Sequence, residues 1–157
     1  LEKQPFVFAQ FIEDIMVKYE LTFKEKNIKL DMKLDYDIII SVDEDRLEQI
    51  IQNIIQNAIR YSKGNPRIEM TMERTDKTCV LAIADNGVGI SEEHLSTITN
   101  RFVRVNKVQS RKESGTGLGL SIVEKLMVLH GGKLTIESQL EVGTTVKLEF
   151  PILNCND

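Results

Sequence analysis

One stretch of this chain, residues 43–62, constrains the fold more than any other. It reads DEDRLEQIIQNIIQNAIRYS, and its apolar residues recur at i, i+3, i+4, i+7 and i+8, which is the spacing of one face of a helix. These residues are Leu47, Ile50, Ile51, Ile54, Ile55, Ala58 and Ile59. We expect Asp43 to cap this helix and the apolar face to pack into the core of the protein.

A second stripe of side chains follows one flank of the same helix, beside the apolar face rather than opposite it. The stripe consists of Asn53, Asn57, Arg60 and Tyr61. Two amides, a cation and a phenol at the edge of a buried surface can line a ligand pocket. The alternative is a solvated helix flank, and this helix alone does not decide between the two.

The rest of the chain alternates between helical and extended patterns. Helical spacing covers residues 8–26, 91–100 and 117–130. Extended patterns cover residues 5–8, 28–34, 37–42, 67–74, 78–84, 133–138 and 144–150. Short turns between several of these strands indicate hairpins, which require antiparallel pairs. We therefore predict an α+β fold, a two-layer α/β sandwich in which a mixed, largely antiparallel sheet of about five strands is covered on one face by about three helices.

Composition excludes several classes of protein. The chain has 157 residues, which suits one domain with its own core, and its net charge of −4 gives no general reason to bind nucleic acid. Two cysteines support neither a disulfide framework nor a zinc site. No apolar run approaches the roughly 18 residues that span a bilayer, and no signal-peptide pattern is present. Because the sequence does not begin with Met, we expect it to be part of a longer protein.

Two glycine-rich motifs carry candidate chemistry. Residues 85–90, DNGVGI, follow a strand, where a carboxylate can accept from an exocyclic amine while the glycines let backbone approach a flat ligand. Residues 115–120, GTGLGL, open a helix, whose N–H groups and dipole favour an anion. Each motif alone is weak, because the first can be an ordinary turn. The second lacks the third glycine of a dinucleotide fingerprint, and the chain has no P-loop.

The order of the motifs is more informative than any one of them. N-x-x-x-N on a helix is followed by D-x-G-x-G after a strand, a basic segment at residues 102–114, G-T-G-L-G-L at a helix start, and Gly143-Thr144-Thr145 in a late hairpin. This order resembles the ATP-binding catalytic domain of bacterial sensor histidine kinases. The same superfamily holds DNA gyrase, the MutL repair proteins and a heat-shock chaperone ATPase. The resemblance covers residues 6–151 of a single domain at 1–157, and residues 152–157 form a tail.

The resemblance implies a role for each matching residue. Asn57 would coordinate a Mg²⁺ ion that bridges the phosphates of ATP, and Asn53 would support that metal or the phosphates. Asp85 would accept a hydrogen bond from the adenine amino group, with Thr145 nearby through water. The other residues that would contact the nucleotide are Arg60, Tyr61, Gly87, Gly89, Ile90, Phe102, Arg104, Gly115, Thr116, Gly117, Leu118, Gly119 and Leu120.

Three basic or aromatic positions of the pattern concern the phosphates and a lid over them. Arg60 stands where a phosphate-contacting cation is usual, and Arg104 where an arginine can reach the γ-phosphate. Phe102 would anchor a lid at residues 105–114. The chain departs from the pattern at Val103, usually aromatic, and at Asn106, usually Asp. Neither change removes a phosphate ligand, but both bear on lid conformation.

The resemblance also implies an activity: a protein-histidine kinase fragment that passes the γ-phosphate of ATP to a histidine on a separate dimerisation domain. That domain is expected before residue 1, and the phosphate would then reach an aspartate of a response regulator. Hydrolytic relatives carry a glutamate base where this chain has Asn53, and an amide cannot accept a proton at neutral pH. His94 lacks the pattern of the acceptor, and His130 at a helix end is interpreted as a partner of the helix dipole.

Two other hypotheses remain open from the sequence. The first is a nucleotide-binding regulatory module with little catalysis, and the second is an ATP-gated dimerisation ATPase. For the kinase fragment we expect a monomer that binds ATP without phosphorylating itself, and no contact with nucleic acid or membrane. By resemblance, it would be the cytoplasmic domain of a membrane-anchored bacterial sensor. A purely structural interpretation, in which all these motifs are only turns and helix caps, would require unrelated turns to occur in the family order by chance.

Overall fold

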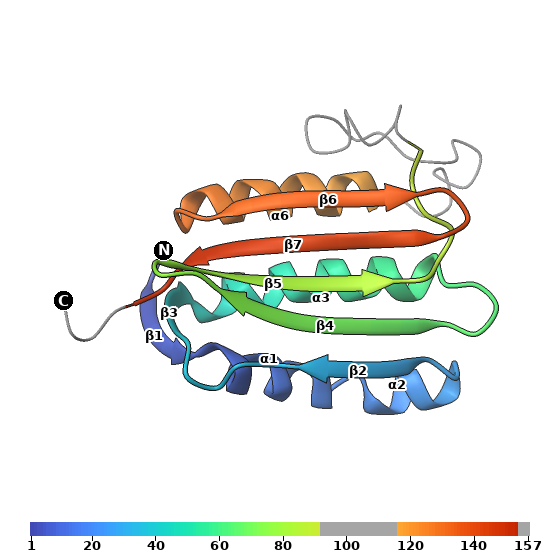
Figure 1. Ribbon diagram of the computed structural model, residues 1–157, viewed down its shortest axis with the longest axis horizontal. Coiled ribbons are helices and arrows are strands. Elements are labelled where there is room, and N and C mark those ends of the chain that lie inside the picture. The colour runs from blue at the N-terminus through green and yellow to red at the C-terminus, as the bar shows by residue number, and fades with distance from the viewer. Residues whose placement is uncertain (92–115, 154–157) are drawn as a thin grey trace.

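The chain folds around a five-stranded sheet. The computed structural model describes residues 1–91 and 116–153, with side chains from residue 120 onward in the second range. The strands are β2 (Lys29–Lys33), β4 (Arg67–Arg74), β5 (Thr78–Asp85), β6 (Lys133–Gln139) and β7 (Gly143–Pro151). Their order is β2-β4-β5-β7-β6, with β2 parallel to β4 and every other pair antiparallel (Figure 1). The predicted mixed, largely antiparallel sheet is thereby confirmed.

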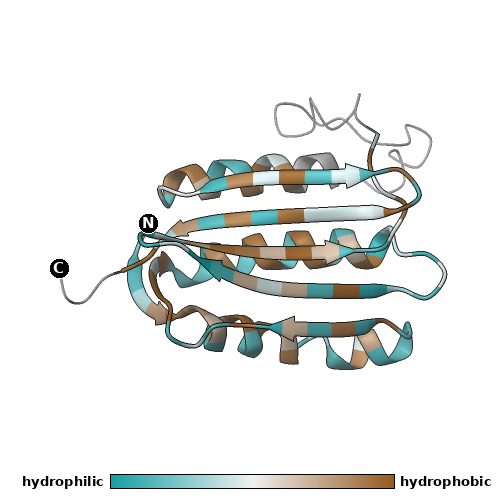
Figure 2. Cartoon of the chain, viewed as in Figure 1, coloured by the Kyte–Doolittle hydropathy of each residue, from teal (hydrophilic) through white to brown (hydrophobic). Residues whose placement is uncertain are grey.

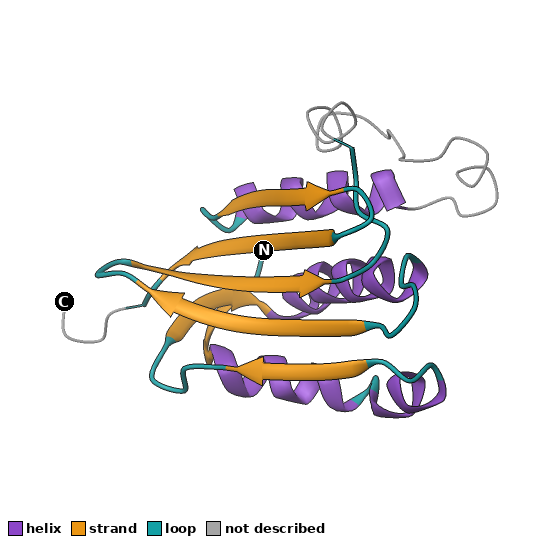
Figure 3. Ribbon diagram, turned by 45° about the vertical axis from the view of Figure 1, so that its right-hand side comes forward, coloured by secondary structure: helices purple, strands orange, loops and turns teal. Residues whose placement is uncertain are grey.

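The described helices lie together on one face of this sheet, and none of them covers the other face (Figures 1 and 3). They are α1 (Phe8–Val17), α2 (Glu20–Glu25), α3 (Glu44–Arg60) and α6 (Thr116–Leu129). Along β2, β4, β6 and β7, apolar and polar residues alternate (Figure 2), whereas the central strand β5 is apolar along most of its length; each strand turns one set of side chains toward the helices. The two-layer sandwich follows from this alternation. The predicted helix at residues 91–100 lies outside the described residues, apart from Ser91.

Helix α3 is the central helix of the helical layer. Its N-cap is Asp43, whose side chain accepts a hydrogen bond from the Arg46 N–H at 3.2 Å, as predicted. Its buried residues are Leu47, Ile50, Ile51, Ile54, Ile55 and Ala58. They belong to one continuous core that also contains residues of α1, α6 and the inner face of the sheet. The apolar stripe read from the sequence therefore is the face that joins the two layers.

The predicted helix at residues 8–26 is wrong in one respect, because the structure breaks it into α1 and α2. At the break, the Lys18 N–H donates to the Ile15 carbonyl and the Tyr19 N–H donates to the Met16 carbonyl, both three residues back. Such a tightened turn ends α1 and gives α2 a new start. Phe23 is the buried residue of α2, and the apolar spacing alone did not reveal the break.

The strand predicted at residues 37–42 forms, but it joins a second, smaller sheet. β3 (Ile39–Asp43) pairs antiparallel with β1 (Lys3–Val7), from Lys3 opposite Asp43 to Val7 opposite Ile39. The short extended segment expected at residues 5–8 is the basis of β1. This two-stranded sheet lies at the end of the molecule that holds both the first residue and residue 153 (Figure 1).

His130 ties the end of α6 to the start of α3. Its side chain is 3% exposed, its Nδ1 lies 2.7 Å from the Leu126 carbonyl, and its Nε2 accepts from the Asp43 N–H at 3.1 Å. A ring nitrogen that accepts a hydrogen bond carries no proton, so in this arrangement the ring is neutral and Nδ1 is the donor. The histidine thus acts through hydrogen bonds rather than as a charge on the helix dipole. Its ring also meets Phe150 edge-on.

None of the helices in the two described ranges is long and apolar enough to cross a membrane.

We predict that His130→Leu lowers the free energy of unfolding by about 1–3 kcal/mol, because the Asp43 N–H loses its partner in a partly buried setting. Urea denaturation of the purified chain measures this change. Leu129→Ala, at an exposed neighbouring position, is the control and should stay within about 0.5 kcal/mol of wild type. Equal stability of His130→Leu and wild type would show that the hydrogen bonds contribute nothing.

Candidate functional site

The predicted site residues that the structure describes gather at one end of the molecule. The C-terminal end of α3, the last residue of β5, the turn between β6 and β7, and the start of α6 all lie there (Figure 1). The chain's first residue lies at the opposite end. This end therefore joins segments that are far apart in the sequence.

Asp85 is the last residue of β5 and shares the helix-facing side of that strand with Leu81 and Ile83. The Gly87 N–H donates to its Oδ1 at 2.8 Å. Burial raises the pKa of this carboxyl, and hydrogen bonds from the backbone N–H groups of Gly87 and Thr144 lower it only in part. Asp85 is thus a desolvated carboxylate, able to accept from a ligand donor that replaces lost water.

The strand register separates Thr144 from Thr145. Asp85 pairs with Thr144 across the β5–β7 ladder, whereas Thr145 pairs with Ala84. Because alternate residues point to opposite faces of a sheet, Thr144 shares the face of Asp85 and Thr145 lies on the other face. The register therefore places Thr144, rather than the Thr145 expected from the sequence, on the same face as Asp85. Two adjacent threonines gave no signal to choose between them.

Gly87 and Gly89 are required by their protein neighbours. A Cβ at Gly87 would lie 2.4 Å from the carbonyl oxygen of Tyr61, and a Cβ at Gly89 would lie 2.0 Å from that of Gln139. Gly89 also has a φ of +74°, a conformation that favours glycine. We expected these glycines to admit a ligand, and the described contacts show in addition that they let the loop pack against α3 and β6.

Ile90 and Leu120 form a small apolar cluster apart from the main core. They are 7% and 3% exposed, and Ile136 of β6 packs against them. The loop after β5, the start of α6 and the sheet edge meet in this cluster. It supplies an apolar surface close in sequence to the carboxylate of Asp85, the combination typical of small-ligand pockets.

The polar flank of α3 is half-buried at Asn53 and Asn57. The Nδ2 of Asn57 is buried and finds no hydrogen-bond partner within the described part of the chain. A buried amide without a partner costs free energy unless a ligand or water satisfies it. Tyr61 fastens this end of α3 to the loop after β5, because its carbonyl accepts from the Val88 N–H at 3.1 Å.

Arg60 takes a different direction from the two asparagines. Its exposed side chain lines a hollow of about 400 Å³ together with Lys26, Gln56 and Ile59, between α2 and α3. Asn53 and Asn57 do not line that hollow. Of the four polar residues that the sequence placed in one stripe, Arg60 lines this hollow and the two asparagines do not.

Several predicted residues cannot be placed. Phe102, Arg104 and Gly115, and the lid expected at residues 105–114, lie outside the described residues. Thr116, Gly117, Leu118 and Gly119 form the first turn of α6, as predicted for a helix start, but their side chains are outside the description.

Two polar side chains, Asn86 and Lys63, make contacts near the site that the sequence did not predict. Asn86 accepts from the Arg67 N–H at 2.8 Å and donates to the Asn65 carbonyl at 2.9 Å. Lys63 donates to the Glu141 carbonyl at 2.6 Å and forms an ion pair with its carboxylate at 3.0 Å. Asn86 belongs to the motif at residues 85–90, but an asparagine before glycine indicates only a turn. The sequence therefore carries no signal for its hydrogen bonds to residues 19 and 21 positions earlier.

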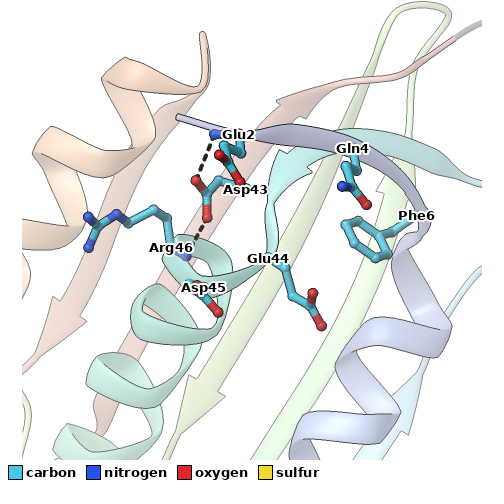
Figure 4. Close-up of a pocket in the computed structure, with 7 residues that line it drawn as sticks. All are labelled: Glu2, Gln4, Phe6, Asp43, Glu44, Asp45 and Arg46. Carbon is cyan, nitrogen blue, oxygen red and sulfur yellow. Dashed lines mark hydrogen bonds between the residues drawn. The ribbon is translucent and has the colours of Figure 1, made fainter.

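A second hollow, of about 360 Å³, lies at the start of α3, far from these residues (Figure 4). Its lining residues are Glu2, Gln4, Phe6, Asp43, Glu44, Asp45 and Arg46. The Asp43 carboxylate is already engaged by the N–H groups of Glu2 and Arg46, which hold its pKa below the usual range. Among the described residues, no group of three or more His, Cys, Asp or Glu side chains could hold a metal ion.

Known proteins share this fold and much of this sequence. The chain is 33% identical to the sensor protein SrrB of Staphylococcus aureus over 150 residues, which are 96% of this chain and 25% of that protein. It therefore spans about a quarter of the length of that relative. The nucleotide-free catalytic domain of the histidine kinase ThkA matches with a TM-score of 0.82 at 28% identity, covering 96% of this chain and 98% of that one.

A further solved structure, of ThkA in complex with the response regulator TrrA, shares the fold with a TM-score of 0.77 at 24% identity, over 96% of this chain and 42% of that one. The sequence profile described as histidine kinase-, DNA gyrase B- and HSP90-like ATPase matches residues 42–154. That range includes α3, the loop after β5, α6 and the last hairpin, which together build the site. The chain therefore belongs to the family of histidine kinase-, DNA gyrase B- and HSP90-like ATPases.

Proposed function

We propose that this chain is the ATP-binding catalytic domain of a sensor histidine kinase and that it transfers the γ-phosphate of ATP to a histidine on another domain. The observation that carries the proposal is the half-buried carboxylate of Asp85 at the end of β5, whose pKa is raised by partial desolvation. An ionised, desolvated acceptor suits the amino group of adenine. The apolar cluster of Ile90 and Leu120 suits the face of the purine.

The phosphates would lie toward the start of α6 and the flank of α3. The first turn of α6 presents backbone N–H groups that favour an anion. Arg60 would turn from its hollow toward the phosphates, and Arg104 and Gly115 would complete the phosphate contacts. Thr144 replaces Thr145 in this proposal, because it is the threonine opposite Asp85.

A magnesium ion fits the donor set. The amide of Asn57 has a buried nitrogen with no partner in the described residues, and its oxygen is the kind of neutral ligand that Mg²⁺ accepts beside phosphates and water. We propose that Asn57 holds the ion, with Asn53 one turn earlier in support. When bound, the ion would neutralise charge on the transferring phosphoryl group.

Transfer to histidine, rather than hydrolysis, follows from Asn53. Water needs a base to become a good nucleophile, and an amide does not accept a proton at neutral pH. A neutral imidazole is already nucleophilic and needs chiefly positioning. We propose that the acceptor lies on a dimerisation domain of the parent protein and that a response-regulator aspartate receives the phosphate next. The complex of the histidine kinase ThkA with the response regulator TrrA supports a partner of this kind.

By the same reasoning, we propose that the parent protein is a membrane-anchored sensor and that this domain works in the cytoplasm. The similarity to the sensor protein SrrB supports the proposal. Cys79 is a buried free cysteine, and burial raises the pKa of its thiol to about 11.

We predict that Asp85→Asn weakens ADP binding by about ten- to a hundredfold, the loss of one hydrogen bond to a charged group. Calorimetric titration of ADP with Mg²⁺ into the purified chain measures the dissociation constant. Asp76→Asn, in the exposed turn between β4 and β5, removes a charge of the same kind and should bind as wild type does. Unchanged ADP affinity in Asp85→Asn would refute the adenine assignment.

The pH dependence of base recognition gives a second prediction. Because burial raises the pKa of Asp85, the carboxyl becomes protonated at a higher pH than an exposed aspartate does. A protonated carboxyl donates rather than accepts, so it stops favouring an amino group over an oxo group. We expect the preference for ADP over IDP to decline as the pH falls through that raised pKa. Both nucleotides carry the same phosphates, so phosphate titration cancels from the ratio of their dissociation constants.

That ratio is measured by calorimetry between pH 4 and pH 7.5, a range that reaches down to the ordinary aspartate pKa of about 4 and therefore includes any raised value within it. Asp76→Asn should follow the wild-type curve. A preference for ADP that stays constant across the range would mean that Asp85 does not read the base.

Phosphoryl transfer gives a third prediction. We expect the native chain, extended on its N-terminal side to include a histidine-bearing dimerisation domain, to incorporate phosphate from labelled ATP and Mg²⁺ on histidine. Asn57→Ala should abolish incorporation, whereas Gln56→Ala, at an exposed position next to it, should not. Steady phosphate release without labelled protein would favour the ATPase hypothesis. Nucleotide binding with neither outcome would favour the regulatory module.

A further inference from the structure

Ser138 lies behind the proposed base-recognition pair, outside every motif that the sequence singled out. It is on β6, on the face that turns toward the helices, together with Leu134 and Ile136. The register places it opposite Thr144, which in turn is opposite Asp85. Ser138, Thr144 and Asp85 therefore form one row across three neighbouring strands.

The hydroxyl of Ser138 has three hydrogen-bond partners. Its oxygen accepts from the Ile90 N–H at 2.7 Å, lies 2.7 Å from the Thr144 Oγ1, and lies 2.9 Å from the Gly143 carbonyl oxygen. One contact holds the loop after β5, and the other two hold the first residues of β7. A single side chain thus connects the loop that follows Asp85 to the strand that faces it.

Counting protons leaves one arrangement that makes all three bonds. A serine hydroxyl has one proton and two lone pairs. The carbonyl of Gly143 can only accept, so the Ser138 proton goes there. The Thr144 hydroxyl must then donate its own proton to Ser138, whose second lone pair is taken by the Ile90 N–H. Thr144 is left with lone pairs alone.

We infer that Ser138 is a positioning residue that makes Thr144 a hydrogen-bond acceptor, so that Asp85 and Thr144 together select a purine with an amino group over one with an oxo group. Ser138 does not touch the base in this arrangement. It acts by accepting the Thr144 hydroxyl proton in a hydrogen bond, so that Thr144 cannot donate that proton to an oxo group of the base. The inference rests on the proposed function, because it concerns the nucleotide base that Asp85 would bind.

Removal of Ser138 has a specific consequence. In Ser138→Ala, the Thr144 hydroxyl is free to rotate and can donate to the oxo group of IDP. We expect ADP to bind about three- to tenfold more weakly and the preference for ADP over IDP to fall by about tenfold. A merely structural role would weaken both nucleotides alike and leave the ratio unchanged.

The experiment is calorimetric titration of ADP and IDP, with Mg²⁺ and at neutral pH, into wild type, Ser138→Ala, Thr144→Val and the double variant. Thr144→Val removes the acceptor, so it should also reduce the preference for ADP. Because Ser138 acts through Thr144, the double variant should show the same ratio as Thr144→Val alone. Thr135→Ala, on the opposite face of β6, is the matched control and should behave as wild type.

Ser138→Cys, whose side chain has the same shape and is slightly larger, serves if the alanine variant does not fold, since a thiol is a poor donor and acceptor. Equal weakening of ADP and IDP in the Ser138 variants, or a further loss of preference in the double variant, would overturn the inference while leaving the proposed function intact. Wild type that binds no ADP would defeat the proposed function itself. A normal ADP to IDP ratio in Thr144→Val would also overturn the inference.

Discussion

The packing of α3 against the sheet is the constraint on which the other features depend. Its apolar face is fully committed to the core, which fixes the rotation of the helix about its own axis. Once that rotation is fixed, Asn53 and Asn57 can point only along the flank, at the edge of the core. A helix with a weaker apolar stripe could roll, and the asparagines would lose any fixed relation to Asp85. The core and the site therefore share one helix, and the first positions the second.

The site itself works against stability. Burial raises the pKa of Asp85, so the ionised form at neutral pH costs the folded state free energy that is regained as the pH falls through that raised value. The amide nitrogen of Asn57, which has no partner among the described residues, adds a second cost. Contacts nearby offset these terms: Asn86 closes the loop before β4, and Lys63 holds the turn between β6 and β7. Local strain at a binding site, with support from the surrounding fold, is a common arrangement.

Sequence patterns predicted the elements that depend on hydrophobic periodicity. They did not predict features that a shift of a single residue determines. The helix at residues 44–60, its Asp43 cap and the largely antiparallel sheet follow from spacing and turns, and all three are present. The break between α1 and α2 is a tightening by one residue, which leaves apolar spacing nearly unchanged. The choice between Thr144 and Thr145 depends on strand register, which pairs residues far apart in the chain. Ser138 was invisible because its partners come from two other segments.

The positions of the described ends of the chain have a practical consequence. Residue 1 and residue 153 both lie beside the small β1–β3 sheet, at the end of the molecule away from Asp85 (Figure 1). α3, which has 17 residues and is therefore about 25 Å long, runs from the end of the molecule that holds residues 1 and 153 to the opposite end, where the site lies. A fluorescent protein, an affinity tag or a sensor surface attached near either end would therefore leave the site facing solvent. In a single-molecule experiment that pulls on both ends of the chain, the force would likewise act on the small sheet before it acts on the site.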